Sequence, residues 1–182
     1  MVQNYFDETF KNKVYRYYYI DGKSIMYMDF EFGIKNYMHL CGFKYKKGSK
    51  KFWSDLKIGR INFKELSVRN DETVWQKLEI LDALKMLNTL NVGITNSIGE
   101  TLNMQYNLSI ISAHRRIFQL ILLPDKFKEG LYVPVSLRNT KTDTHKLQVP
   151  KRVICVKCLD NNSIIACEEE YIEKIDKLNT NG

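Results

Sequence analysis

Several features that mark common protein classes are missing from this sequence. No segment approaches the roughly 20 consecutive apolar residues that a membrane-spanning helix needs, and residues 1–8 hold no apolar signal core. We therefore expect a protein that stays in the cytoplasm and makes no membrane contact, unless a dedicated system exports it. There is no glycine-rich phosphate loop and no G-x-S-x-G motif, so nothing indicates a P-loop nucleotide site or an α/β-hydrolase nucleophile.

Clustered carboxylates are also missing, and this bears on the type of reaction. Metal-dependent nucleases group Asp and Glu to hold Mg²⁺, but no such group stands out here. The C-x-x-C pair of Cys155 and Cys158 has no second pair to complete a zinc site. Both cysteines fall in an expected strand, where positions three apart point to opposite faces. We therefore expect reduced, semi-buried thiols, no metal and no cofactor.

The composition indicates one folded domain with a moderate positive charge. The chain has 182 residues, and 44% of them are apolar, which is enough for a sizeable core in a single domain over residues 1–182. Lys and Arg exceed Asp and Glu by 28 to 21, so the formal net charge is +7. This excess permits a polyanionic partner without requiring one. The 11 tyrosines, some beside lysines, suit base stacking in a nucleic-acid complex.

Helix signals lie mainly in the first half of the chain and strand signals mainly in the second half. The Asp21-Gly22 turn predicts a hairpin, because this dipeptide tolerates the positive φ angles of two-residue turns. We expect hairpin strands over residues 14–20 and 24–32, a helix over 74–90, later strands over 108–115, 117–124, 131–137 and 152–159, and a charged helix over 168–178. This order predicts an α+β fold, in which helices and a small N-terminal hairpin precede a four-stranded antiparallel sheet.

A histidine lies inside a short apolar segment. The neighbours of His39 favour burial: Tyr37, Met38, Leu40 and Phe43. We therefore expect the imidazole to lie inside or beside the core. Gly42 can end a short helix here, since glycine tolerates the left-handed conformation that is common at helix ends. The alternative is a half-buried histidine with a purely structural role.

A lysine interrupts the apolar side of the predicted helix over residues 74–90. When residues are placed at about 100° steps around the axis, Lys77 falls between Leu81 and Leu84, in the middle of the apolar arc. Such a lysine extends its ammonium to solvent, finds a partner, or points into a functional site. The sequence leaves these three interpretations open.

Polar side chains alternate along the expected strand over residues 131–137. Tyr132, Ser136 and Arg138 fall on one face, so a phenol, a hydroxyl and a guanidinium would line it. The two intervening valines and Leu137 would take the core face. A polar face exposed to water is also common in antiparallel sheets, so this pattern alone does not indicate a site.

Further basic residues occur in three places. Lys46 and Lys47 lie in a basic loop over residues 44–51, which is either a solvated turn or a phosphate-contacting loop. His145 lies in a short polar-to-apolar segment that suits an edge strand, and Arg115 ends the first strand of the expected sheet. A histidine with basic and hydroxyl partners suits metal-free cleavage of RNA, in which the 2′-hydroxyl attacks the adjacent phosphate.

Six short motifs, in order, resemble a known family. They are N-Y-M-H-L-C-G-F (Asn36–Phe43), F-W-S-D-L (Phe52–Leu56), Q-K-L-E-I-L (Gln76–Leu81), I-S-A-H-R (Ile111–Arg115), Y-V-P-V-S-L-R (Tyr132–Arg138) and R-V-I-C-V (Arg152–Val156). The first is similar to the F-x-H-L-x-G-type motif of a phage-type family of BECR nucleases, the barnase/EndoU/colicin/RelE-like group. The similarity covers residues 14–160.

The resemblance implies a BECR-like nuclease core and a metal-independent ribonuclease of phage or mobile-element type, of the kind thought of as toxins or effectors. It implies that His39 is the general acid or base, that Lys77 and Arg115 neutralise the phosphate, and that Ser136 orients it. We expect Arg138, Tyr132, His145, Lys46 and Lys47 to contact the RNA. The alternatives are a non-catalytic protein that inhibits a bacterial defence complex, with a host or immunity protein as partner, and a nucleic-acid binder without catalysis.

Overall fold

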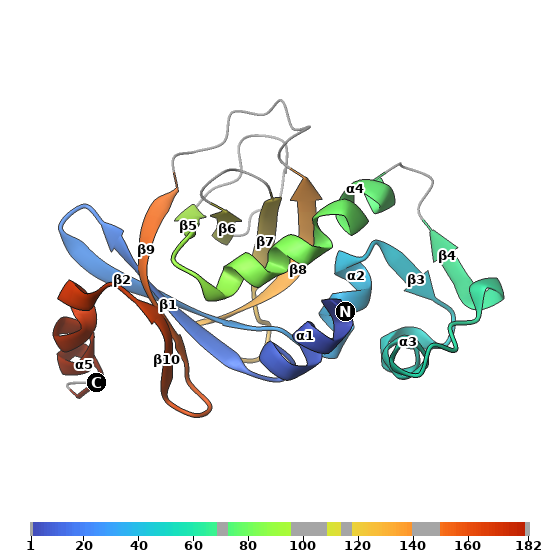
Figure 1. Ribbon diagram of the computed structural model, residues 1–182, viewed down its shortest axis with the longest axis horizontal. Helices are drawn as coiled ribbons and strands as arrows, with labels where there is room; N and C mark the ends of the chain where they lie inside the picture. Colours follow the sequence, from blue (N-terminus) through green and yellow to red (C-terminus); the bar gives the residue numbers. More distant parts are fainter. Residues whose placement is uncertain (1, 69–72, 96–108, 114–117, 140–149, 181–182) are drawn as a thin grey trace.

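The computed structural model of the chain describes residues 2–68, 73–95, 109–113, 118–139 and 150–180 (Figure 1). The helices are α1 (Val2–Thr9), α2 (Ile34–Leu40), α3 (Gly48–Lys57), η1 (Phe63–Glu65), α4 (Thr73–Ile80), η2 (Leu81–Asn88), η3 (Glu169–Tyr171) and α5 (Ile172–Thr180), where η denotes a 3₁₀ helix. The strands are β1 (Val14–Asp21), β2 (Ser24–Glu31), β3 (Phe43–Tyr45), β4 (Leu66–Val68), β5 (Val92–Thr95), β6 (Ser109–Ala113), β7 (Phe118–Pro124), β8 (Leu131–Asn139), β9 (Lys151–Cys158) and β10 (Ser163–Cys167). The mixed α+β class is confirmed.

The predicted four-stranded sheet is wrong, because the main sheet is larger and includes the N-terminal hairpin. Within the described residues its strand order is β1-β2-β8-β7-β6-β5-β9-β10, and β1 also pairs with β9, so the sheet curls and the pairing closes on itself. The contact between β2 and β8 is parallel, with Asp29 opposite Leu131, and the other contacts are antiparallel. The hairpin itself is confirmed. The sequence concealed the long-range pairing that joins the hairpin to the later strands.

The main core lies between this sheet and the helices, and its N-terminal end is aromatic. The ring of Phe6 lies 4.6 Å from that of Phe32 and 4.8 Å from that of Tyr37, and the Tyr37 and Trp53 rings are 5.1 Å apart. These contacts join α1, α2 and α3 to the residue that follows β2. Edge-to-face aromatic pairs add specific geometry to hydrophobic burial. The rings therefore fix how the first three helices sit against the sheet.

The helix predicted over residues 74–90 changes character halfway. It is α-helical only through Ile80 and continues as the 3₁₀ helix η2. The buried leucines of η2 are Leu81, Leu84 and Leu87. Their spacing of three puts them on one side of a helix with three residues per turn, so burial of this row accounts for the tighter winding. Among the described residues, none of the helices combines the length and apolar character needed to cross a membrane.

The C-terminal helix packs on the opposite face of the sheet from the main core. Ile175 of α5 is fully buried against Tyr18, Ile154 and Cys155. Cys158, three residues after Cys155, belongs to the main core. The two cysteines of the C-x-x-C motif therefore point to opposite faces, as predicted. The charged helix is anchored by its apolar residue and is not a free tail.

Candidate functional site

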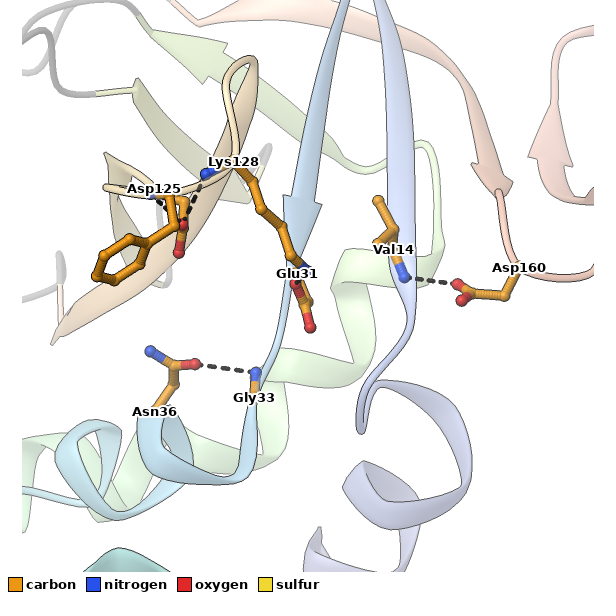
Figure 2. Close-up of polar contacts among 8 residues, drawn as sticks. Val14, Glu31, Gly33, Asn36, Asp125, Lys128 and Asp160 are labelled. Atoms are coloured by element: carbon orange, nitrogen blue, oxygen red, sulfur yellow. Dashed lines mark hydrogen bonds and ion pairs between the residues drawn. The ribbon is translucent and has the colours of Figure 1, made fainter.

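Helix α2 is attached to strand β8 by one buried side chain. Asn36 accepts a hydrogen bond from the Gly33 backbone N–H at 2.9 Å (Figure 2) and donates one from Nδ2 to the Pro134 carbonyl at 2.7 Å. The first bond satisfies a donor at the start of the helix, which has no partner within the helix. The second lies just beyond the parallel pairing of β2 with β8, which ends at Phe30 and Tyr132. The hydrogen bond of Asn36 therefore extends the contact with β8 beyond the last paired residues of β2.

His39 lies in the last turn of α2, and its side chain is exposed. The helix buries Tyr37, Met38 and Leu40 on its other sides, so the prediction of a helix with apolar neighbours is confirmed. Because the residue is exposed, the imidazole lies beside the core and not inside it, and the alternative of a half-buried structural histidine is wrong. Lys35, one turn earlier, is also exposed, and residues four apart are neighbours on a helix surface. His39 is thus held by a well-packed helix while its ring remains accessible.

Lys77 of α4 is half-buried and approaches the C-terminal end of α2. Gly42 ends α2 with φ +80°, and its N–H donates to the His39 carbonyl at 3.0 Å. A Cβ atom added at Gly42 would lie 2.9 Å from Val74 Cγ2 and 3.4 Å from Lys77 Cδ. Glycine is therefore required for its backbone angle and for the close approach of α4. His39 and Lys77 belong to two helices that meet at this point.

The thiol next to this contact is not a nucleophile at neutral pH. Burial raises the pKa of Cys41 to about 12, although a hydrogen bond with Tyr37 and the charge of Lys77 act in the opposite direction. Only the thiolate form of cysteine is strongly nucleophilic. Cys41 therefore serves as a small apolar residue at the end of α2.

A β-bulge in β8 changes which polar residues share a face. Ile121 pairs with Ser136 and the next residue, Leu122, pairs with Pro134, so Val135 is the extra residue. A bulge shifts the alternation of side chains by one position. Consequently Tyr132 packs against the main core, and the prediction that it shares a face with Ser136 and Arg138 is wrong.

Ser136 and Arg138 are half-buried on the other face of β8. They pair with Ile121 and Gln119 of β7, and Gln119 in turn pairs with Ser112 of β6. Gln119 is only 4% exposed and was missed by the sequence analysis. A glutamine within the otherwise apolar strand 118–124 was the signal that could have identified it. Polar residues of β7 and β8 therefore lie next to one another on this face.

The remaining candidates lie apart from β8 or outside the described residues. Lys46 and Lys47 are exposed at the turn between β3 and α3. The predictions for Arg115 and His145 lie outside the described residues. Within the described ranges, no three residues among His, Cys, Asp and Glu are grouped to hold a metal ion.

The structure brings several of the predicted residues onto elements that contact one another. Helices α2 and α4 both pack against β8 (Figure 1). These three elements carry His39, Lys77 and the pair Ser136 and Arg138. His39 and Lys77 therefore belong to helices that pack on β8, whereas Ser136 and Arg138 lie on the face of this strand that points away from the main core and α2.

Comparison with known proteins identifies the family. No curated protein and no solved structure matches the chain. A family model described as phage-Barnase-EndoU-ColicinE5/D-RelE like nuclease 4 matches residues 2–174. This range includes every element from α1 to the first part of α5. The chain therefore belongs to the phage-Barnase-EndoU-ColicinE5/D-RelE like nuclease 4 family.

Proposed function

We propose that this protein is a metal-independent ribonuclease that cleaves RNA by attack of the 2′-hydroxyl on the adjacent phosphate. The observation that carries the proposal is the accessible imidazole of His39 on a helix fixed to β8 by Asn36. An imidazole can give or take a proton near neutral pH. Membership of a nuclease family and the neighbouring Lys77 support the same chemistry.

The proposed reaction needs three kinds of group. His39 acts in proton transfer, either removing the proton of the 2′-hydroxyl or protonating the leaving 5′-oxygen. Lys77 and an arginine offset the negative charge that develops on the phosphate. Ser136, to which the resemblance gives the role of orienting the phosphate, lies on the face of β8 that points away from α2, so this third role is left without a residue. The bond between phosphorus and the 5′-oxygen breaks as the bond between phosphorus and the 2′-oxygen forms. The products are a 2′,3′-cyclic phosphate and a free 5′-hydroxyl.

Incubation of the purified protein with total RNA in EDTA tests the proposal. We expect fragments with 2′,3′-cyclic phosphate ends, and a loss of about 10²-fold or more in cleavage rate for His39→Ala. Lys35→Ala is the matched control, because this residue is exposed on the same side of α2 and has no assigned role. Intact RNA at high protein concentration, or equal rates for His39→Ala and the wild type, would contradict the proposal.

A non-catalytic interaction protein is the second candidate. It is favoured by large apolar side chains left in solvent, since Trp75 is 72% exposed and Phe127 is 93% exposed. Aromatic residues are enriched in protein interfaces. This candidate predicts stoichiometric co-purification of a host protein that His39→Ala does not affect, together with intact RNA.

A further inference from the structure

We infer that the segment from Phe43 to Val68 binds single-stranded RNA, with its lysines on the phosphates and a base stacked on Phe63. This segment, the basic lobe, consists of β3, α3, η1 and β4, and it lies to one side of the main sheet (Figure 1). The inference rests on the proposed function and deepens it, because it names the form of the substrate and the surface that holds it.

The basic lobe carries almost all of the excess charge of the protein. It holds eight Lys and Arg residues against two acidic residues, a net +6 of the chain's +7. All eight are exposed: Lys44, Lys46, Lys47, Lys50, Lys51, Lys57, Arg60 and Lys64. Such a concentration of positive charge favours a polyanion, because contacts with phosphates release bound counterions. A protein partner is less suited, since lysine is depleted in the centres of protein interfaces.

Few of these charges are neutralised within the protein. Lys51 pairs with Asp55 at 2.7 Å, and Lys57 pairs with Asp7 at 2.6 Å. The structure shows no ion pair between the other six basic side chains and any described residue. Asp55 is itself buried, where it accepts a hydrogen bond from the Tyr45 hydroxyl at 2.8 Å. The outer surface of the lobe is therefore strongly positive.

An exposed aromatic ring accompanies this charge. Phe63 is 78% exposed on η1, directly before Lys64. The interior of the lobe does not need this ring, because it is filled by Phe52, Tyr45 and the half-buried Phe43. A solvent-facing ring among basic side chains is the arrangement on which unpaired bases stack. Bases within an A-form duplex present no free face to such a ring, so the pattern favours a single strand.

Hydrogen bonds fix the backbone around Phe63. The side-chain oxygen of Asn62 accepts from the Lys64 N–H at 3.0 Å, and the Asn62 N–H donates to the Tyr45 hydroxyl at 3.4 Å. The Glu65 carbonyl accepts from the Lys46 N–H at 3.0 Å. These bonds attach η1 to β3. A platform that is already ordered loses less conformational entropy on binding.

The basic lobe adjoins the candidate site. It follows α2 and precedes α4 in the chain, and these helices meet where Gly42 contacts Val74 and Lys77. Helix α2, which carries His39 in its last turn, also packs against α3 and β3 of the lobe. The lobe would supply affinity, whereas the proposed chemistry belongs to the elements around β8.

Binding of a non-cleavable RNA tests the inference without relying on catalysis. The probe is a fluorescein-labelled single-stranded oligonucleotide with 2′-O-methyl sugars, and its anisotropy is measured over a range of salt concentrations. We expect Phe63→Ala to weaken binding by about 5- to 150-fold with an unchanged salt dependence. Phe127→Ala is the matched control, since this exposed ring lies outside the lobe, between β7 and β8. The double variant Lys46→Gln/Lys47→Gln should reduce the slope of log affinity against log salt by about 1.4.

The outcomes separate this inference from the proposed function. Equal binding by the Phe63→Ala and Phe127→Ala variants, or tighter binding of duplex than of single-stranded RNA, would overturn the inference. Cleavage of natural RNA that does not depend on Phe63 would overturn it while leaving the proposed function intact. Binding of the probe that depends on Phe63, without any cleavage of natural RNA, would support the inference and overturn the proposed function. Thermal unfolding of each variant verifies that it is folded.

Discussion

Replacing Asn36 by alanine should loosen the attachment of α2 to β8. The substitution removes hydrogen bonds to the Gly33 N–H and to the buried Pro134 carbonyl. The Asn36 side chain is 6% exposed, so water does not readily replace it. A buried group that loses its partner costs about 1–3 kcal/mol. With two partners affected, one of them only partly buried, we expect a loss of about 2–4 kcal/mol in the free energy of unfolding.

Urea-induced unfolding followed by circular dichroism measures this loss directly. In a chain of this length, about 1 kcal/mol shifts the melting temperature by roughly 2–4 °C, so a decrease of about 4–16 °C should accompany it. Asn4→Ala is the control, because Asn4 is exposed on α1 and such surface changes stay within about 0.5 kcal/mol. Asn36→Asp separates the two bonds, since it keeps an acceptor for Gly33 and loses the donor to Pro134.

A result within about 0.5 kcal/mol of the wild type for Asn36→Ala would refute the reasoning. It would mean that α2 is held to β8 by its apolar contacts alone.

A second consequence concerns activity. If α2 moves when Asn36 is replaced, RNA cleavage by the folded variant should fall together with stability, because the position of His39 depends on this helix.

Three further predictions concern other parts of the molecule. Gly42→Ala should lower the free energy of unfolding in urea by about 2–4 kcal/mol, because the position has a positive φ and an added Cβ would lie 2.9 Å from Val74 of α4. Gly59→Ala is the control: this position also has a positive φ but open space around it, so the loss should be about 1 kcal/mol. Hydrogen bonds from Lys51, the larger effect, and from Tyr45 lower the pKa of Asp55 below 3.8. Its carboxylate therefore stabilises the fold above pH 3.8, so the deficit of Asp55→Asn should shrink as pH falls through the lowered pKa in acid-unfolding curves. Cys155 and Cys167 are opposite one another in β9 and β10, and the hydrogen bond from the Glu168 N–H to the Ile154 carbonyl makes them a non-hydrogen-bonded pair with Cα atoms about 4.5 Å apart, a separation that suits a disulfide. Burial raises the pKa of the Cys155 thiol, so glutathione disulfide should join the two cysteines during refolding from urea and not in the folded protein; an intact mass unchanged after such refolding would contradict this.

The features that could be predicted from the sequence are those with local causes. The hairpin follows from the Asp21-Gly22 turn, and four later strands follow from runs of apolar and β-branched residues. The opposite orientations of Cys155 and Cys158 follow from strand geometry alone. Each of these features needs only neighbouring residues to specify it.

The features that were missed depend on contacts between distant residues. The short strands β5 and β10 form because edges of other strands are available to them, and four or five residues give too weak a periodic signal to be recognised. The bulge at Val135 depends on how β7 and β8 align, which no local pattern records. Gln119 lies opposite Arg138 only in this register. The polar pair of Gln119 and Arg138 across β7 and β8 was therefore not predictable from spacing.

The exposure of His39 has a geometric cause that the composition of its segment concealed. Apolar residues at positions 37, 38, 40 and 41 surround it in sequence, but at about 100° per residue they leave one side of α2 open. His39 and Lys35 occupy that side. A short helix can therefore be buried over most of its circumference and still present one ring to solvent. This is also the arrangement a general acid or base requires, since the backbone is held rigidly while the ring remains within reach of a substrate.

Affinity and chemistry are assigned to different elements of this protein, and that separation has a kinetic consequence. The basic lobe holds +6 of the net charge but none of the residues proposed for proton transfer. His39 and Lys77 lie on α2 and α4, which both pack against β8, and Phe63 is 78% exposed on another element. Loss of a contact that holds substrate and transition state equally raises KM and leaves kcat unchanged. Phe63→Ala should therefore act on KM, whereas His39→Ala should act on kcat; an effect of Phe63→Ala on kcat alone would show that the ring contributes to the chemical step.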